Sequence, residues 1–106
     1  MYVRISVGKF SAERAEEVAH HLRTSELSLR PAVETLPGFR AYFVGLDRRL
    51  GFMTNTSVWD SLDAAEQMST LPEMLALREG FEALGVVFNP ITNHERLWQS
   101  GFAGHS

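Results

Sequence analysis

The sequence predicts an α+β protein in which a four-stranded antiparallel sheet carries helices on one face. Two observations lead to this prediction. Stretches with the alternating pattern of strands and stretches with the spacing of amphipathic helices follow one another in the order strand, helix, strand, strand, helix, strand. The chain of 106 residues is also of normal length for one domain and is long enough to bury a core. In one compact domain this order is the ferredoxin-like βαββαβ arrangement.

The first strand is expected over residues 2–8, where apolar and polar side chains alternate. Three apolar side chains point to one face: Val3, Ile5 and Val7. The intervening side chains point to the other face: Tyr2, Arg4 and Ser6. The strand therefore has one apolar face and one face of mixed polarity.

A long amphipathic stretch follows the first strand. Ser11 is a suitable N-cap for a helix, and apolar residues then recur at helical spacing: Ala15, Val18, Ala19 and Leu22. We expect this helix to loosen near residues 24–25. A second turn or short helix, with Pro31 early in it, is expected to follow.

The second and third strands form a hairpin. The turn-forming pair Pro37-Gly38 precedes the second strand, which is expected over residues 39–46. A polar turn over residues 47–49 then leads into the third strand, which begins close after Gly51.

The third strand runs into a helix, and this junction is the most informative part of the chain. Asn55 and Trp59 are four residues apart on the strand, so both side chains lie on one face. Asp60 or Ser61 can cap the helix that follows. An amide and an indole on one strand face, next to the start of a helix, are suitably placed to line a pocket.

The C-terminal part is expected to form a further helix and a last strand. Pro72 is tolerated in the first turn of that helix, and Gly85 is placed to end it. Its apolar residues recur at helical spacing: Met74, Leu77, Phe81 and Leu84. Residues 86–88 are apolar but are cut short by Asn89-Pro90, so we expect the last strand over residues 91–98.

Composition and charge exclude several classes of protein. The net charge of −3 argues against a nucleic-acid binder, which normally carries a basic patch. The sequence contains no cysteine, so disulfides, thiolate nucleophiles and thiolate metal sites are excluded, and no other metal cluster is recognisable. No apolar run approaches the ~20 residues that a membrane-spanning helix needs. We expect one cytoplasmic domain over residues 1–106, with a tail from about residue 99 and no membrane partner.

The predicted sheet is partly apolar on both faces, whereas helices can cover only one. An uncovered second face would expose an apolar patch on the order of several hundred Å², which usually marks an interface. A two-fold homodimer that pairs sheet against sheet would bury this patch.

Two segments resemble the antibiotic biosynthesis monooxygenase family of dimeric α/β barrels. They are residues 36–40, Leu-Pro-Gly-Phe-Arg, and residues 57–65, Ser-Val-Trp-Asp-Ser-Leu-Asp-Ala-Ala. The resemblance extends over about residues 2–98. It implies a homodimer of two ferredoxin-like subunits whose sheets face each other, with a pocket between sheet and helices in each. Some members of this family oxidise polycyclic aromatic phenols with O2 and without metal or flavin, and others degrade haem.

The resemblance also implies roles for two residues. Cofactor-free monooxygenases of the family use an Asn and a Trp four residues apart on the third strand, and Asn55 and Trp59 match them. The pair would hold the substrate oxygen and stabilise the deprotonated form that reacts with O2, since amide and indole N–H groups both donate to an oxyanion. Haem degradation is not expected, because residues 61–70 lack the required His and the first strand lacks the required Asn. The same helix also lacks a Tyr that such oxidases have.

Seven further residues are candidates for substrate binding: Arg4, Arg40, Tyr42, Met68, Arg78, Phe81 and His94. Arg4, Arg40 and Tyr42 could share a face with a ligand, the arginines as clamps for a carboxylate or phenolate. Cross-strand or dimer contacts are the alternative for these three. Arg78 would add positive charge.

The remaining candidates also have two interpretations each. Met68 and Phe81 suit an apolar pocket, but Met is more often core filler. His94 could act as a base if it faces the pocket, or it is a structural histidine. Trp59 could likewise be a core residue that anchors the following helix, and Asn55 an edge-strand residue.

The predicted function is a cofactor-independent monooxygenase that acts on an aromatic or polyketide-like small molecule. The alternative is a ligand-binding or interaction dimer of the same fold that does no chemistry, because the helix Tyr and a convincing base are missing. An isomerase or decarboxylase would require His94, or another ionisable group, inside the pocket.

Overall fold

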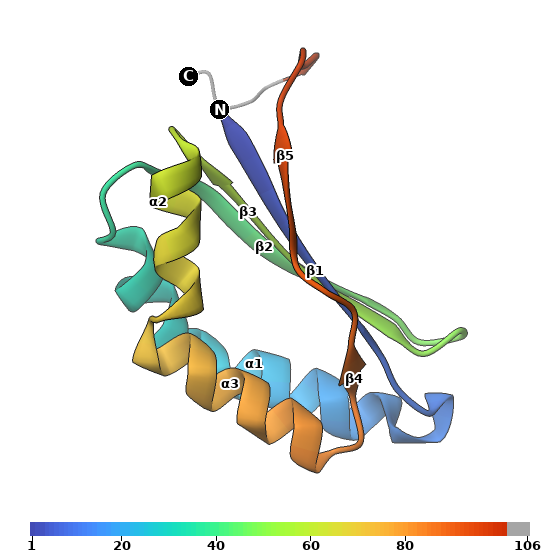
Figure 1. Ribbon diagram of the computed structural model, residues 1–106. Coiled ribbons are helices and arrows are strands. Elements are labelled where there is room, and N and C mark those ends of the chain that lie inside the picture. Colours follow the sequence, from blue (N-terminus) through green and yellow to red (C-terminus); the bar gives the residue numbers. More distant parts are fainter. Residues whose placement is uncertain (102–106) are drawn as a thin grey trace.

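The computed structural model describes residues 1–101 and has an α+β fold (Figure 1). Its elements are β1 (Tyr2–Lys9), η1 (Ala12–Arg14), α1 (Ala15–Glu34), β2 (Phe39–Asp47), β3 (Phe52–Trp59), α2 (Leu62–Glu66), η2 (Gln67–Ser69), α3 (Pro72–Ala83), β4 (Val87–Phe88) and β5 (Thr92–Glu95). The predicted ferredoxin-like order and antiparallel sheet are confirmed, with five strands in place of four.

The sheet has the order β2-β3-β1-β4, and β5 also pairs with β1. All pairings are antiparallel, and β1 and β3 lie at its centre. The expected last strand over residues 91–98 is shorter, as β5 covers only Thr92–Glu95, and residues 87–88 before it form a separate strand, β4. Pro90 explains the break, because it has no N–H to donate to the ladder. The Asn89 N–H still donates to the Val7 carbonyl at 2.9 Å, which keeps the segment against β1.

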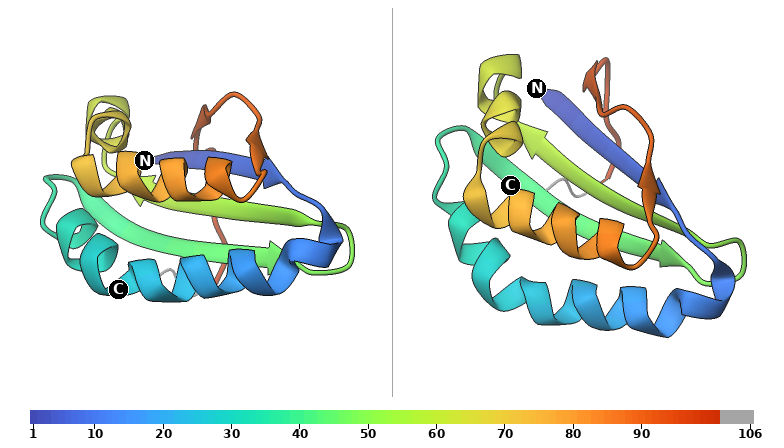
Figure 2. Two further views of the ribbon diagram at one scale, coloured as in Figure 1. Left: turned by 90° about the horizontal axis from the view of Figure 1, so that it is seen from below. Right: turned by 60° about the horizontal axis from the view of Figure 1, so that its bottom comes forward.

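Helices α1 and α3 lie side by side across one face of the sheet (Figures 1 and 2). His21 of α1 connects the two helices. Its Nε2 donates a hydrogen bond to the Leu77 carbonyl oxygen at 3.1 Å, and its ring packs edge-on against Phe81. Gly80 makes room for this ring, because a Cβ there would lie 2.3 Å from His21 Nε2. The chain therefore uses a small residue on α3 to bring the two helices together.

The expectation that the first helix ends near residues 24–25 is wrong. Helix α1 continues to Glu34 and contains Pro31, which lacks the N–H that would bond to Leu27. Its C-terminal part turns away from the axis of the first part (Figure 2). Leu29 and Val33 are buried in the core, so packing holds this part in the helix despite the proline.

The core lies between the helices and the sheet. Its wholly buried apolar side chains come from all parts of the chain and include Val18, Val33, Met53, Trp59, Met68 and Phe81. No helix among residues 1–101 is long and apolar enough to cross a membrane.

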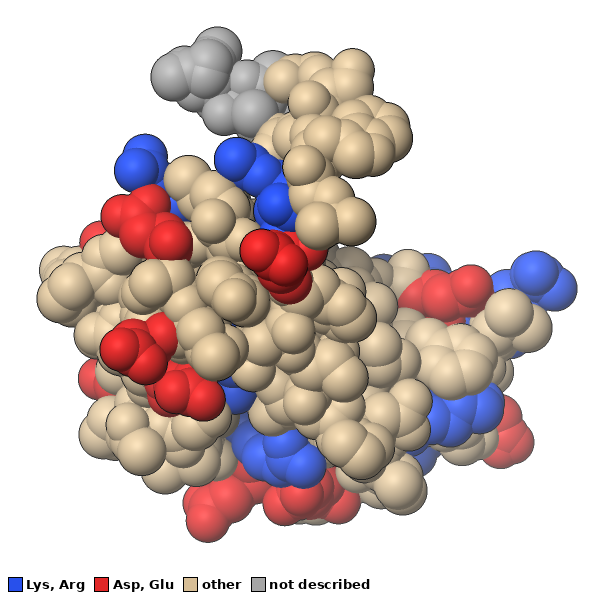
Figure 3. Space-filling view, turned by 45° about the horizontal axis from the view of Figure 1, so that its top comes forward, with Lys and Arg blue, Asp and Glu red and all other residues tan. Residues whose placement is uncertain are grey.

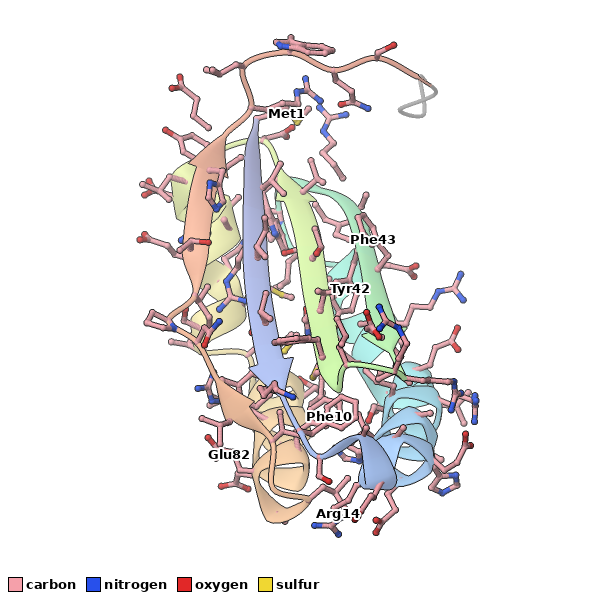
Figure 4. All side chains as sticks on the ribbon, turned by 90° about the vertical axis from the view of Figure 1, so that its right-hand side faces the viewer. Met1, Phe10, Arg14, Tyr42, Phe43 and Glu82 are labelled. Atoms are coloured by element: carbon pink, nitrogen blue, oxygen red, sulfur yellow. The ribbon has the colours of Figure 1, made fainter. Side chains whose placement is uncertain are left out.

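Strand β1 turns its apolar side chains away from the helices, whereas the apolar side of a strand usually lies beneath them. The strand alternation predicted for β1 holds, but its apolar side points away from the helices: Val3, Ile5 and Val7 are half-buried, whereas Arg4 and Ser6 are buried. Figure 4 looks onto the uncovered face, with the helices behind the strands. In Figure 3, charged side chains gather toward the rim of the view and its middle is largely neutral. On β1 the covered side is therefore the more polar one.

Candidate active site

The covered face of the sheet carries a cluster of buried polar side chains. Arg4 and Ser6 come from β1, and Asn55 and Ser57 come from β3; all four are at most 6% exposed. The strand register pairs Arg4 with Ser57 and Ser6 with Asn55, so the four occupy neighbouring positions. Tyr42 of β2 lies opposite Ser57 on the other side. Three adjacent strands thus bring these residues together, and we call them the polar cluster.

Several atoms of this region have no hydrogen-bond partner among the described residues. They are Tyr42 Oη, Asn55 Oδ1, Ser57 Oγ and Trp59 Nε1, and all are buried. The Asn55 amide nitrogen donates only to Met74 Sδ, at 3.7 Å. Buried polar atoms are nearly always paired in folded proteins, and each unpaired one costs about 1–3 kcal/mol. A group of them on one face indicates a site for a ligand or for water.

Two hollows adjoin the polar cluster. The larger, the α1 hollow, has a volume of about 410 Å³ and is lined chiefly by α1 and β2, including Leu22, Leu29 and Tyr42. This volume falls within the range of small-molecule pockets, roughly 300–1,000 Å³. The smaller, the Arg4 hollow, has a volume of about 30 Å³, which suits a water or one small chemical group. Leu77 lines both hollows and therefore lies between them.

Arg4 is the only charged member of the polar cluster. Its guanidinium donates to Ser69 Oγ at 3.4 Å, and within residues 1–101 it forms no ion pair. Burial lowers the pKa of Arg4, Tyr42 raises it, and the positive charge of Arg78 lowers it. Arginine nevertheless keeps its proton in proteins. The cluster therefore contains a positive charge with no negative partner.

Tyr42 stays neutral at ordinary pH. Burial raises the pKa of its hydroxyl to about 12, against the opposing effects of the Asn55 amide and of Arg4. The Asn55 amide lies near enough to favour the ionised form of Tyr42, but the Tyr42 hydroxyl and the Asn55 side chain do not form a hydrogen bond. Tyr42 can thus donate a hydrogen bond to a ligand, but it cannot serve as a base near neutral pH.

Tyr42 should make the stability of the protein depend on pH in the alkaline range. Its pKa is about 12 in the folded protein, above the ordinary value of 10.0, so its contribution to stability is full below pH 10 and is lost between pH 10 and pH 12. The loss corresponds to about 2–3 kcal/mol of unfolding free energy. We expect urea denaturation to show this loss in the wild type relative to Tyr42→Phe. The phenolate absorbance that is lost in Tyr42→Phe isolates the titration of Tyr42, and a midpoint at its ordinary value of 10.0 would contradict the buried hydroxyl.

Asn55 and Trp59 share the covered face of β3, as expected from their spacing. Asn55 lines the Arg4 hollow. Trp59 is wholly buried, lines neither hollow, and packs edge-on against Phe39 with ring centroids 5.8 Å apart. Met68 is also wholly buried in the core, whereas Phe81 lines the Arg4 hollow. The catalytic roles of the pair stay predictions.

Of the charged candidates, the structure brings Arg4 and Arg78 together. Arg78 lies at the Arg4 hollow, bonds Glu82 at 3.3 Å and stacks over Phe88. Arg40 lies apart from both hollows and pairs with Asp60 at the surface, at 2.5 Å.

His94 also lies away from the polar cluster. On β5 it stands opposite Val3, on the uncovered face, where it is exposed and bonds Thr92 at 2.8 Å. A base at this position would be on the wrong side of the sheet for chemistry at Asn55. Residues 1–101 contain no group of three or more His, Cys, Asp or Glu side chains that could hold a metal ion.

Ser6 and Ser57 belong to the site but were not predicted from the sequence. The serines alternate with apolar residues, which in an ordinary sheet would put them in solvent. Only the pairing of β1 with β3 shows that they are buried beside Arg4 and Asn55. The sequence signal that could have found them is the run of polar residues at alternate positions on both central strands.

The fold and the polar cluster define a ferredoxin-like α+β protein with a candidate small-molecule site between sheet and helices. No protein-family model and no curated protein matches the sequence. A protein from Deinococcus radiodurans, provisionally described as an antibiotic biosynthesis monooxygenase, is 25% identical, with a TM-score of 0.71 over 96% of this chain and 98% of its own. One from Nitrosomonas europaea with the same provisional description is 14% identical, with a TM-score of 0.69 over 92% and 100% of the two chains.

A third similar structure is an asparagine-to-alanine mutant of SnoaB, a cofactor-independent oxygenase from Streptomyces nogalater. It is 16% identical, with a TM-score of 0.63 over 92% of this chain and 94% of its own. The chain has the fold of the antibiotic biosynthesis monooxygenases, and the resemblance predicted from its sequence is confirmed.

Proposed function

We propose that this protein is a cofactor-independent monooxygenase that acts on an aromatic or polyketide-like molecule with an acidic phenol or enol. One observation carries the proposal: polar atoms without partners lie side by side with an unpaired guanidinium on the covered face of the sheet. Tyr42 Oη, Ser57 Oγ and Trp59 Nε1 can donate hydrogen bonds, as can the guanidinium. Such donors suit an oxygen atom that becomes negatively charged during a reaction, because they stabilise it most in a dry interior.

The reaction assigned to the site needs only the substrate and O2. The substrate loses a proton to solvent water, and the resulting anion delivers electrons to O2 and forms a carbon–oxygen bond. The peroxide anion then takes up a proton from solvent. The resulting hydroperoxide loses water, so one oxygen atom becomes a carbonyl and the other leaves as water. The Asn55 amide and the Tyr42 hydroxyl would donate to the anion, and Trp59 would do so once its N–H is uncovered. Arg4 would favour loss of the proton through its charge.

The test is O2 uptake with dithranol, a phenolic anthrone, in the presence of EDTA and without flavin. We expect O2 consumption above the buffer rate, with one O2 used per anthraquinone formed. Replacing the principal donor in Asn55→Ala should lower kcat by about 100-fold. Asn93→Ala, which changes an exposed asparagine of β5, is the control and should keep full activity. Unchanged turnover in Asn55→Ala would overturn the assigned role.

The active form in this proposal is a cytoplasmic homodimer in which residues 1–106 form one domain. Its support is the uncovered sheet face, which presents Val3, Ile5 and Val7, together with exposed Phe43. Pairing this face with that of a second copy would remove its apolar side chains from water.

A ligand-binding protein of the same fold that does no chemistry is the second candidate. It is favoured by the position of Trp59, which is wholly buried and lines neither hollow. The two functions are separated by the fluorescence of Trp59 in a Trp98→Phe background. Quenching by dithranol without O2 uptake would favour binding alone.

A further inference from the structure

Arg4 is a charge that the described chain does not balance. Its side chain is only 3% exposed, and its sole side-chain hydrogen bond, to Ser69 Oγ, is long at 3.4 Å. The six ion pairs of the described residues all lie at the surface and involve other arginines. A buried cation is normally paired with an anion, since removing it from water is costly. Residues 1–101 therefore do not supply an anionic partner for this guanidinium.

The hollow beside Arg4 has the size and lining for that partner. Its volume is about 30 Å³, and its polar lining consists of Arg4, Ser6, Asn55 and Arg78. No carboxylate lines it, and both of its charged residues are cations. Burial lowers the pKa of Arg4, Tyr42 raises it, and the positive charge of Arg78 lowers it.

A second copy of the chain cannot supply the partner through the uncovered face of the sheet. Arg4 points to the covered face, beneath α3, whereas Val3 and Ile5 on either side of it point outward. An external anion would therefore reach Arg4 between the sheet and the helices, where a substrate would bind.

Resting on the proposed function, we propose that the Arg4 hollow is a carboxylate-binding site and that the substrate is an aromatic carboxylic acid. The fork of a guanidinium matches a carboxylate with two parallel hydrogen bonds. The Ser6 hydroxyl supplies a further donor, and the hollow is too small for more than one such group, so the Asn55 amide at its edge stays available to the reacting oxygen. Leu77 separates it from the α1 hollow, so a rotation of this side chain would join the two and give room for the rings.

The test compares naphthoate with naphthamide, which has nearly the same shape and no charge. Binding is measured by the shift in melting temperature and by Trp fluorescence. We expect the wild type to bind naphthoate about 10- to 100-fold more tightly than naphthamide, as charged hydrogen bonds predict. Arg4→Met should abolish this preference and, without ligand, should melt at the same or a higher temperature, because it removes an unpaired buried charge. Arg49→Met, which removes an exposed charge at the hairpin, should keep the preference.

Further measurements identify the source of the anion and control for misfolding of the variants. Formate at the same concentrations should raise the melting temperature less than naphthoate does; an equal rise would show a free-anion site and overturn the inference about the substrate. Arg4→Lys keeps the charge without the fork and should retain only part of the preference. If both ligands bind the wild type equally, the carboxylate site is wrong, even where dithranol turnover depends on Asn55. If naphthoate binds through Arg4 but no phenol is oxidised, the site stands and the oxygenase proposal fails.

Discussion

Replacing Trp59 with phenylalanine should lower the turnover of dithranol by about 100- to 1,000-fold while the protein stays folded. The indole nitrogen of Trp59 is buried and has no partner within the described chain. A phenylalanine keeps an aromatic ring against Phe39 but removes the N–H donor. We expect the unfolding free energy to fall by only about 1–2 kcal/mol, because the smaller ring leaves a cavity but no unpaired polar atom.

This variant separates the two interpretations of Trp59. A residue that only packs would show the loss of stability and no loss of turnover at saturating substrate. Trp98→Phe, which changes an exposed tryptophan, is the matched control for both measurements. Full turnover in Trp59→Phe would remove Trp59 from the mechanism and leave Asn55 and Tyr42 as donors.

Placing a carboxylate on the uncovered face should convert the proposed dimer into monomers. Ile5 lies on the central strand β1, and its side chain points away from the helices. In Ile5→Asp the two carboxylates of a symmetric dimer would be buried near each other, so we expect the dissociation constant to rise at least about 100-fold. Sedimentation equilibrium should show a mass near 11.9 kDa in place of twice that value.

The control is Leu75→Asp, which makes the same kind of change at an exposed position on α3. It should leave the mass unchanged, since α3 lies on the other side of the sheet. A wild-type protein that sediments as a monomer would contradict the dimer itself, whatever the variants do.

Local patterns predicted most of the fold. The alternation along β1 and β3 is a property of neighbouring residues, and it correctly placed Asn55 and Trp59 on one face. The short strand β4 before Pro90, the early end of β5 and the continuation of α1 through Pro31 were missed. These features depend on what lies across the fold: β1 holds the segment around Pro90, and the core holds Leu29 and Val33.

The site was predictable only in part, because the sequence does not say which face of the sheet the helices cover. An apolar row such as Val3, Ile5 and Val7 would ordinarily be expected beneath the helices. The structure has it outside, and this choice buries Arg4 and Ser6. Long-range pairing of β1 with β3 also brings together residues about fifty positions apart, such as Ser6 and Asn55, which no local pattern links.

The outward-facing apolar side of β1 has a consequence for how the protein is maintained in the cell. A subunit whose apolar strand side faces outward completes its hydrophobic burial only by association, so in the proposed dimer unfolding and dissociation form one linked equilibrium. Stability then depends on the amount of protein present as well as on its sequence. A low level of expression would leave a larger fraction of chains with the β1 surface open to aggregation and to proteases.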